Sequence, residues 1–183
     1  MNRIFFTIVG AYLILYGFIL FTRRKIMEKN EYGSIFVLII SIIPFVIDYF
    51  EKDYEQVDLL GMIIVVILPI TIISIILNRE RYNIINVNSQ MIKTTIIDLL
   101  RENDISYEEE KNAIILKDHD NKRISYKERF NSVDLKLTDI RQLTFYKELK
   151  TELKYRIKEI DRSVFPFSGI FYIIFGILIV VVI

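Results

Sequence analysis

The sequence predicts a membrane α-helical protein with four transmembrane helices and an inserted small α+β cytosolic domain. Two observations predict this class. Hydrophobic residues make up 52% of the 183 residues, more than a water-soluble domain of this length needs. Charged residues still make up 26%, the usual share for a soluble protein, so the two kinds of residue must be segregated along the chain.

Four apolar segments have the length of a membrane span. A helix needs roughly 17 to 25 mostly apolar residues to cross a hydrocarbon core of about 30 Å. The segments cover residues 4–21, 34–50, 59–77 and 166–183, so the first three belong to a predicted membrane region at 1–77. Pro44 and Pro69 lie inside the second and third segments, where proline removes a backbone donor and kinks a helix.

The distribution of basic residues predicts the orientation of these segments. Arg23, Arg24 and Lys25 follow the first segment, and Arg79 follows the third, whereas the connection between the second and third is acidic. Basic residues near span ends are retained on the cytoplasmic side. We therefore expect both termini outside the cell and residues 78–165 in the cytoplasm.

Residues 78–138 are predicted to form the α+β domain. Short β-branched or alternating runs at 81–87, 105–107, 113–116, 124–126 and 133–137 are typical of strands. Between the first two, four apolar residues recur at helical spacing after a capping Asn88 or Ser89, and these are Ile92, Ile96, Leu99 and Leu100. A helix packed on a small antiparallel sheet is expected.

Residues 139–165 are predicted to be an amphipathic basic helix and a linker. Apolar residues recur every three or four positions from Ile140 to Ile160, and lysines tilt the other surface towards positive charge. Three arrangements compete, in this order of preference: packing on the sheet, lying at a membrane surface with lysines towards anionic headgroups, and pairing with a partner helix.

Glycines in the first and fourth segments predict a helix–helix contact. Gly10 and Gly17 are seven residues apart, as are Gly169 and Gly176, so each pair lies nearly on one face of its helix. Small residues permit close backbone approach between helices. The two segments run antiparallel in the expected topology, so the two glycine faces can meet.

Catalytic and metal-binding signatures are weak. The chain has no cysteine and one histidine, which excludes thiolate nucleophiles and histidine clusters. Asp118, His119 and Asp120 resemble part of a metal-dependent hydrolase site or a Ca²⁺ loop, but the further histidines, or the glycine and distal glutamate, are absent. A hairpin turn is the favoured interpretation. We therefore expect no metal, no cofactor and no enzymatic activity.

The function expected from the sequence is that of a non-enzymatic accessory subunit or an immunity-type protein in a membrane, with a cytosolic regulatory or interaction module. The alternative is a small channel or transporter component built from the two proline-kinked segments. Expected partners are the lipid bilayer and either another protein or a second copy of the chain. A net charge of +1 gives no reason to expect nucleic acid.

Overall fold

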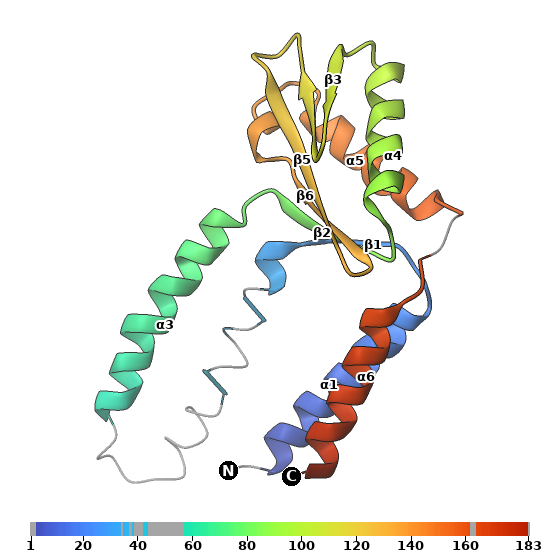
Figure 1. Ribbon diagram of the computed structural model, residues 1–183. Coiled ribbons are helices and arrows are strands. Elements are labelled where there is room, and N and C mark those ends of the chain that lie inside the picture. The colour runs from blue at the N-terminus through green and yellow to red at the C-terminus, as the bar shows by residue number, and fades with distance from the viewer. Residues whose placement is uncertain are drawn as a thin grey trace.

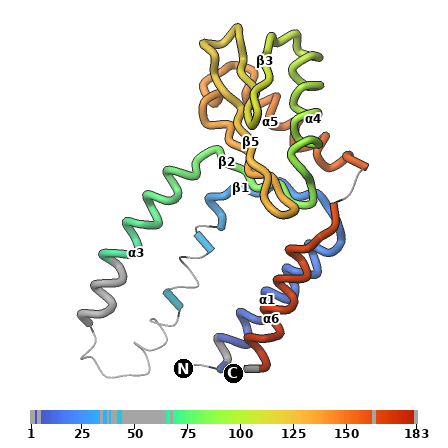
Figure 2. Tube along the Cα trace, viewed as in Figure 1, coloured from blue at the N-terminus to red at the C-terminus, as the bar shows by residue number. Residues whose placement is uncertain are grey.

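The computed structural model describes residues 3–33, 35–36, 38, 42–43, 57–161 and 164–182 (Figure 2). These residues form an α+β fold built on a six-stranded antiparallel sheet (Figure 1). In Figure 1 the sheet and the helices α4 and α5 form the upper part of the molecule, and the helices α1, α3 and α6 extend below it.

The strands follow the order β1-β2-β6-β5-β4-β3 across the sheet, and every neighbouring pair is antiparallel. The last four strands in the chain form a meander, whereas β2 lies between β6 and β1. Their bounds are β1 (Ile26–Lys29), β2 (Arg81–Ile85), β3 (Tyr107–Glu110), β4 (Ala113–Leu116), β5 (Lys122–Arg129) and β6 (Ser132–Lys136).

Strand β1 was not predicted, because its residues were expected to lie in a basic loop after the first apolar segment. Ile26 pairs with Ile85 and Lys29 with Tyr82, so β1 forms one edge of the sheet. Four half-buried residues are too few to show an alternating pattern in the sequence. The ladder with β2 defines this strand, and that pairing brings a segment from outside residues 78–138 into the sheet.

Helices α4 (Ser89–Glu102) and α5 (Tyr146–Glu159) pack on the sheet and share its core. The side chain of Asn88 accepts a hydrogen bond from the Met91 N–H at 2.9 Å, which caps the start of α4. A short 3₁₀ turn, η1 (Thr138–Ile140), precedes α5. The helices contribute apolar side chains that are almost fully buried: Ile92, Ile96, Leu99, Leu100, Leu149, Leu153 and Ile157. The amphipathic helix thus packs on the sheet.

Helices α1 (Arg3–Phe21) and α6 (Phe167–Val182) pack against each other along their lengths (Figure 1). A Cβ atom on Gly10 would lie 2.9 Å from the carbonyl oxygen of Gly176, and one on Gly17 would lie 2.7 Å from that of Gly169. Only glycine fits so close to a neighbouring backbone. The structure therefore brings all four of these glycines together at one antiparallel helix contact.

The prediction of a membrane fold class with four spans is wrong. Within the part of the chain that the structure describes, no helix combines the length and the apolar character that crossing a membrane requires. Helix α6 has 16 residues, about 24 Å at 1.5 Å per residue and short of the roughly 30 Å of a hydrocarbon core. Hydropathy identifies side chains that avoid water, but it does not show which surface covers them. Helices α1 and α6 cover part of each other's apolar surface. The observed class is α+β.

Two further expectations rested on those spans and are corrected with them. The placement of both termini outside and of residues 78–165 in the cytoplasm is wrong, because the described residues contain no spanning helix that could orient the chain. The prediction of an integral membrane function is wrong for the same reason. This applies to the accessory subunit or immunity-type protein and to the alternative, a channel or transporter component. Pro69 lies inside α3 (Val57–Leu77), whereas Pro44 and most of residues 34–50 lie outside the described residues. A kink at either proline stays a prediction.

A buried asparagine joins the helical pair to the sheet. The Asn86 side chain is fully buried, and its Nδ2 donates to the carbonyl oxygens of Leu20 at 3.0 Å and Arg24 at 2.9 Å. Its Oδ1 accepts from Nδ2 of Asn131 at 3.2 Å. Carbonyls at the end of a helix lack their usual intrahelical partners. Asn86 adds a second donor to Leu20, which also accepts from the Arg23 N–H at 3.2 Å, and supplies a donor to Arg24, just after α1. This connection fixes the end of α1 beside the β5–β6 hairpin.

A second buried polar cluster surrounds Glu80, which follows α3. Its Oε2 accepts hydrogen bonds from the hydroxyl of Tyr82 at 2.6 Å and from that of Tyr146, and Nε of Arg141 lies 4.0 Å from Oε1. Burial alone would raise the pKa of the Glu80 carboxyl, but the hydroxyls of Tyr146 and Tyr82 outweigh it, so the net shift is below the ordinary value. The ionised carboxylate therefore links the exit of α3 to the start of α5.

The fold should lose stability in acid through this carboxylate. A lowered pKa in the folded state means that Glu80 stabilises the fold above the ordinary pKa of 4.5 and that this contribution disappears as the pH falls through the lowered value. Chemical denaturation at a series of pH values measures the free energy of unfolding. Below pH 4.5 this free energy should fall more steeply for the native chain than for Glu80→Gln. The exposed Glu148→Gln on α5 is the matched control. Equal slopes for native and Glu80→Gln chains would contradict this assignment.

Candidate functional site

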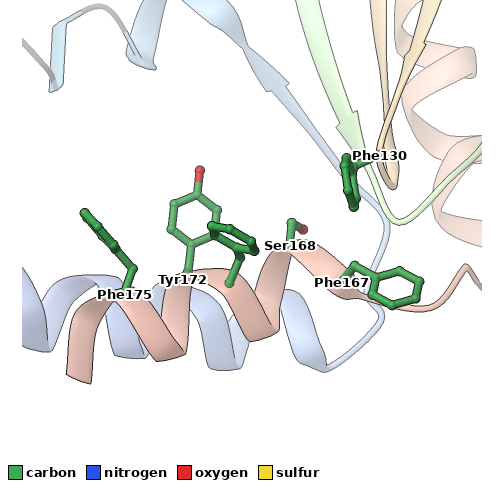
Figure 3. Close-up of a pocket in the computed structure, with 6 residues that line it drawn as sticks. Phe130, Phe167, Ser168, Tyr172 and Phe175 are labelled. Atoms are coloured by element: carbon green, nitrogen blue, oxygen red, sulfur yellow. The ribbon is translucent and has the colours of Figure 1, made fainter. Parts of the chain in front are cut away.

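The candidate site is an apolar groove between α6 and the tip of the β5–β6 hairpin (Figure 3). It has a volume of about 510 Å³, within the range of roughly 300–1,000 Å³ that is usual for ligand pockets. Five of its residues come from α6 and one from the hairpin: Phe130, Phe167, Ser168, Phe171, Tyr172 and Phe175. We call this surface the aromatic groove.

The spacing of phenylalanine along α6 creates one wall of the aromatic groove. Phe167, Phe171 and Phe175 recur every fourth residue, so they form a stripe along one side of the helix. Gly169 and Gly176 lie on nearly the opposite side, against α1. Packing of the glycine side on α1 therefore directs the phenylalanine stripe away from the helical pair.

The hairpin places Phe130 over that stripe. Arg129 pairs with Ser132, so Phe130 and Asn131 form a two-residue tip. The tip is tied down at Asn131, whose backbone carbonyl accepts from the N–H of Asn86 at 2.8 Å and whose side chain reaches the Asn86 amide. Phe130 itself is 87% exposed. An anchored tip thus carries an uncovered aromatic ring above the N-terminal half of α6.

None of the described residues that line the aromatic groove carries a charged side chain. Its polar side-chain groups are the hydroxyls of Ser168 and Tyr172. The Tyr172 ring packs edge-on against Tyr16 of α1, with 5.2 Å between ring centroids, and the Tyr16 hydroxyl donates to Glu28 at 3.3 Å. Burial raises the pKa of the Tyr16 hydroxyl and the Glu28 carboxylate raises it further, so this hydroxyl stays neutral. The chemistry of the lining suits the binding of apolar groups.

The weak catalytic candidates lie away from this groove. Asp118, His119 and Asp120 belong to the connection from β4 to β5, at the opposite end of β5 from Phe130. Asp118 accepts a hydrogen bond from the Ser106 N–H at 3.3 Å, and hydrogen bonding from Ser106 lowers the pKa of its carboxyl. The His119 ring packs 5.0 Å from that of Phe145. Asp120 has a φ of 54°, as expected in a tight turn.

Metal coordination finds no support in this turn. Among the described residues, no group of three or more His, Asp or Glu side chains is placed to hold a metal ion. The three candidates form a turn whose polar groups make hydrogen bonds to nearby residues. That the protein uses no cofactor or metal remains an expectation.

The residues of the aromatic groove were missed in the sequence. Phe167, Phe171 and Phe175 carry a usable signal, because phenylalanine recurs at every fourth position. That signal was obscured because nearly every residue around them is also apolar. Phe130 carries no signal of this kind, since a lone aromatic residue in a turn does not reveal which helix lies beneath it.

No family model, no curated protein and no solved structure matches this chain. Its function must therefore be inferred from its own geometry.

Proposed function

We propose that this chain is a non-enzymatic interaction protein whose aromatic groove binds an apolar helix of a partner protein. One observation supports this: four phenylalanines, each at least 54% exposed, line the same uncharged groove. Large apolar patches on a protein surface mark interaction sites more often than chance exposure does. Aromatic residues are also the usual energetic anchors of protein interfaces.

The energy available from covering the groove is substantial. Fully burying one exposed phenylalanine side chain is favourable by about 1.5–3 kcal/mol. Phe130 and Phe171 are 87% and 76% exposed, so they gain most from a partner. Part of this gain is offset by the loss of freedom on association. Two strongly exposed rings and two half-exposed ones are enough to anchor a small interface.

The shape of the groove favours a helical occupant. The phenylalanine stripe from Phe167 to Phe175 extends over two helical turns, about 12 Å. An amphipathic helix presents apolar side chains at i, i+3, i+4 and i+7 and lays that stripe into a groove of this kind. The wall opposite α6 is a hairpin tip and not an open strand edge, so addition of an extended strand is not favoured.

The proposal can be tested with a labelled model helix. The probe is a peptide of about 18 residues, long enough to hold helical structure, with leucine on one face and lysine and glutamate elsewhere. Fluorescence anisotropy with the full chain should show saturable binding. Phe171→Ser should weaken that binding by about tenfold or more, because it removes a central anchor of the groove.

Two controls test whether the peptide binds in the aromatic groove and through its apolar face. Tyr155→Ser changes an aromatic residue of α5 that is 58% exposed and lies outside the groove, and it should leave binding unchanged. A scrambled peptide of the same composition should bind poorly. Equal binding of native and Phe171→Ser chains would refute the proposal. A native chain that light scattering shows to be a dimer, with Phe171→Ser a monomer, would also refute it, because the occupant would then be a second copy.

A further inference from the structure

The face of the sheet opposite α4 and α5 carries a cluster of basic side chains. In the strand register Arg81 of β2 pairs with Lys136 of β6, which in turn pairs with Ser125 of β5. Cross-strand partners in an antiparallel sheet point to the same face. Lys127, two residues beyond Ser125 on β5, lies on that face as well. Three neighbouring strands therefore present cations side by side.

These side chains line a cavity of about 370 Å³, which we call the basic cavity. Its residues are Arg81, Asn112, Ser125, Tyr126, Lys127, Asp134 and Lys136. It shares no lining residue with the aromatic groove. The inference drawn from it is therefore independent of the proposed function.

The charge of the basic cavity is unbalanced. Three cations face one carboxylate, that of Asp134, which is already engaged by Arg129 at 2.9 Å and by the side chain of Asn30 at 3.2 Å. Lys136 lies 3.4 Å from Asp139, an exposed neighbour three residues along the chain. An excess of positive charge remains beside the cavity.

Arg81 adds a second and independent observation. Its Nε is buried and has no hydrogen-bond partner, and its guanidinium forms no ion pair in the described part of the chain. Buried donors are almost always paired, and a charged donor without a partner is costly to the fold. The Nε is itself covered by protein, so an anion in the cavity would pair with the guanidinium charge through its other nitrogens.

We propose that Arg81, Lys127 and Lys136 form a binding site for the phosphate group of a small phosphorylated molecule. The planar guanidinium matches phosphate oxygens in a two-pronged geometry, and the two ammonium groups complement the remaining charge of a phosphate monoester, which approaches −2 at neutral pH. The Ser125 hydroxyl and the Asn112 amide add neutral donors at the edge of the site. The volume admits the phosphate with a small organic group.

The test uses the full chain with inorganic phosphate and glycerol 3-phosphate as probes. Phosphate should shift the amide resonances of Ser125 and Lys127 saturably in two-dimensional NMR, whereas glycerol should not shift them. Lys127→Gln should weaken binding by about tenfold, since it removes an exposed cation of the site without disturbing the core. Arg81→Gln should weaken it at least as much. Because phosphate binding is ionic, it should weaken further as salt is raised.

Matched variants distinguish phosphate binding in the basic cavity from nonspecific attraction of phosphate to any exposed cation. Lys158→Gln removes one exposed charge from α5 and should leave phosphate binding unchanged. Phe171→Ser, which damages the aromatic groove, should also leave it unchanged, so that failure of one proposal is distinguishable from failure of the other. The absence of any shift at about 50 mM phosphate would refute the site, because specific anion sites with several cations bind more tightly than this. An equal loss of binding in Lys158→Gln would refute it as well.

Discussion

Replacing Asn86 by leucine is expected to lower the free energy of unfolding by about 3 kcal/mol or more, the largest effect of any single substitution proposed for this chain. The change removes the side-chain donor of the Arg24 carbonyl and the acceptor of the Asn131 amide, and it leaves the Leu20 carbonyl with the Arg23 N–H at 3.2 Å as its remaining donor. Each buried polar group left unpaired costs about 1–3 kcal/mol. Leucine must also adopt a φ of 62°, which is strained for any residue with a Cβ.

Two controls separate these contributions in denaturant unfolding experiments. Asn86→Gly removes the side-chain hydrogen bonds but adopts the positive φ without strain. Its free energy of unfolding should therefore be lowered by most of the amount expected for Asn86→Leu. Asn121→Leu introduces leucine at an exposed turn residue with a φ of 53°, and should cost only the strain, about 1 kcal/mol. If Asn86→Leu and Asn121→Leu are equally destabilising, the buried amide does not contribute as proposed.

Replacing Gly17 by leucine is expected to destabilise the chain by about 3 kcal/mol, the upper part of the range for overpacking. Its Cβ would lie 2.7 Å from the Gly169 carbonyl oxygen and 3.0 Å from the Ile173 backbone nitrogen. Backbone atoms cannot move aside as a flexible side chain can, so α1 and α6 must separate. Thermal unfolding of the full chain measures the loss. Binding of the model helix should weaken too, because α6 carries most of the aromatic groove.

The matched control lies in the same chain. A Cβ on Gly33 would meet no atom within 4 Å, so Gly33→Leu should leave both stability and peptide binding nearly unchanged. If Gly17→Leu unfolds at the same temperature as the native chain, the close contact between α1 and α6 is not the packing that holds these helices together.

Local pattern and capping were sufficient to predict much of the sheet and its first helix. The strand at 113–116 has the bounds expected from its sequence, and the strand expected at 133–137 is present one residue earlier. Helix α4 begins after Asn88 as its capping pattern indicates, and its apolar residues are buried. In these elements short-range spacing and tertiary burial require the same conformation, so each could be inferred from neighbouring residues.

Elements that depend on distant partners could not be predicted in this way. Strand β1 is defined by its ladder with β2, more than fifty residues later in the chain. The last helix of the sheet domain was expected from Ile140, but α5 starts at Tyr146, because Ile140 belongs to the preceding 3₁₀ turn. The four spans were predicted from apolar content alone, which does not distinguish a bilayer from a helix or a partner as the covering surface.

The site was less predictable than the fold. The aromatic groove needs Phe130 from a hairpin and Phe171 from a helix forty residues later, and no local pattern connects the two. The basic cavity depends on the register of three strands, of which β2 is distant in sequence from the others. Residues that act together across a sheet become neighbours only once its strand order is known.

The pairing of the first described helix with the last sets the order of events during synthesis. Helix α1 and strand β1 leave the ribosome before their partners, so β1 meets β2 only after the intervening segment is made, and α1 meets α6 only after α6 is made. At 5–20 residues per second, the time between the synthesis of Phe21 and that of Phe167 is roughly seven to thirty seconds. A nascent or truncated chain therefore displays an unpaired apolar helix and no aromatic groove. Recognition through the groove would be a property of chains in which α6 has been made and has packed on α1, and shorter nascent chains would present instead the kind of surface that chaperones bind.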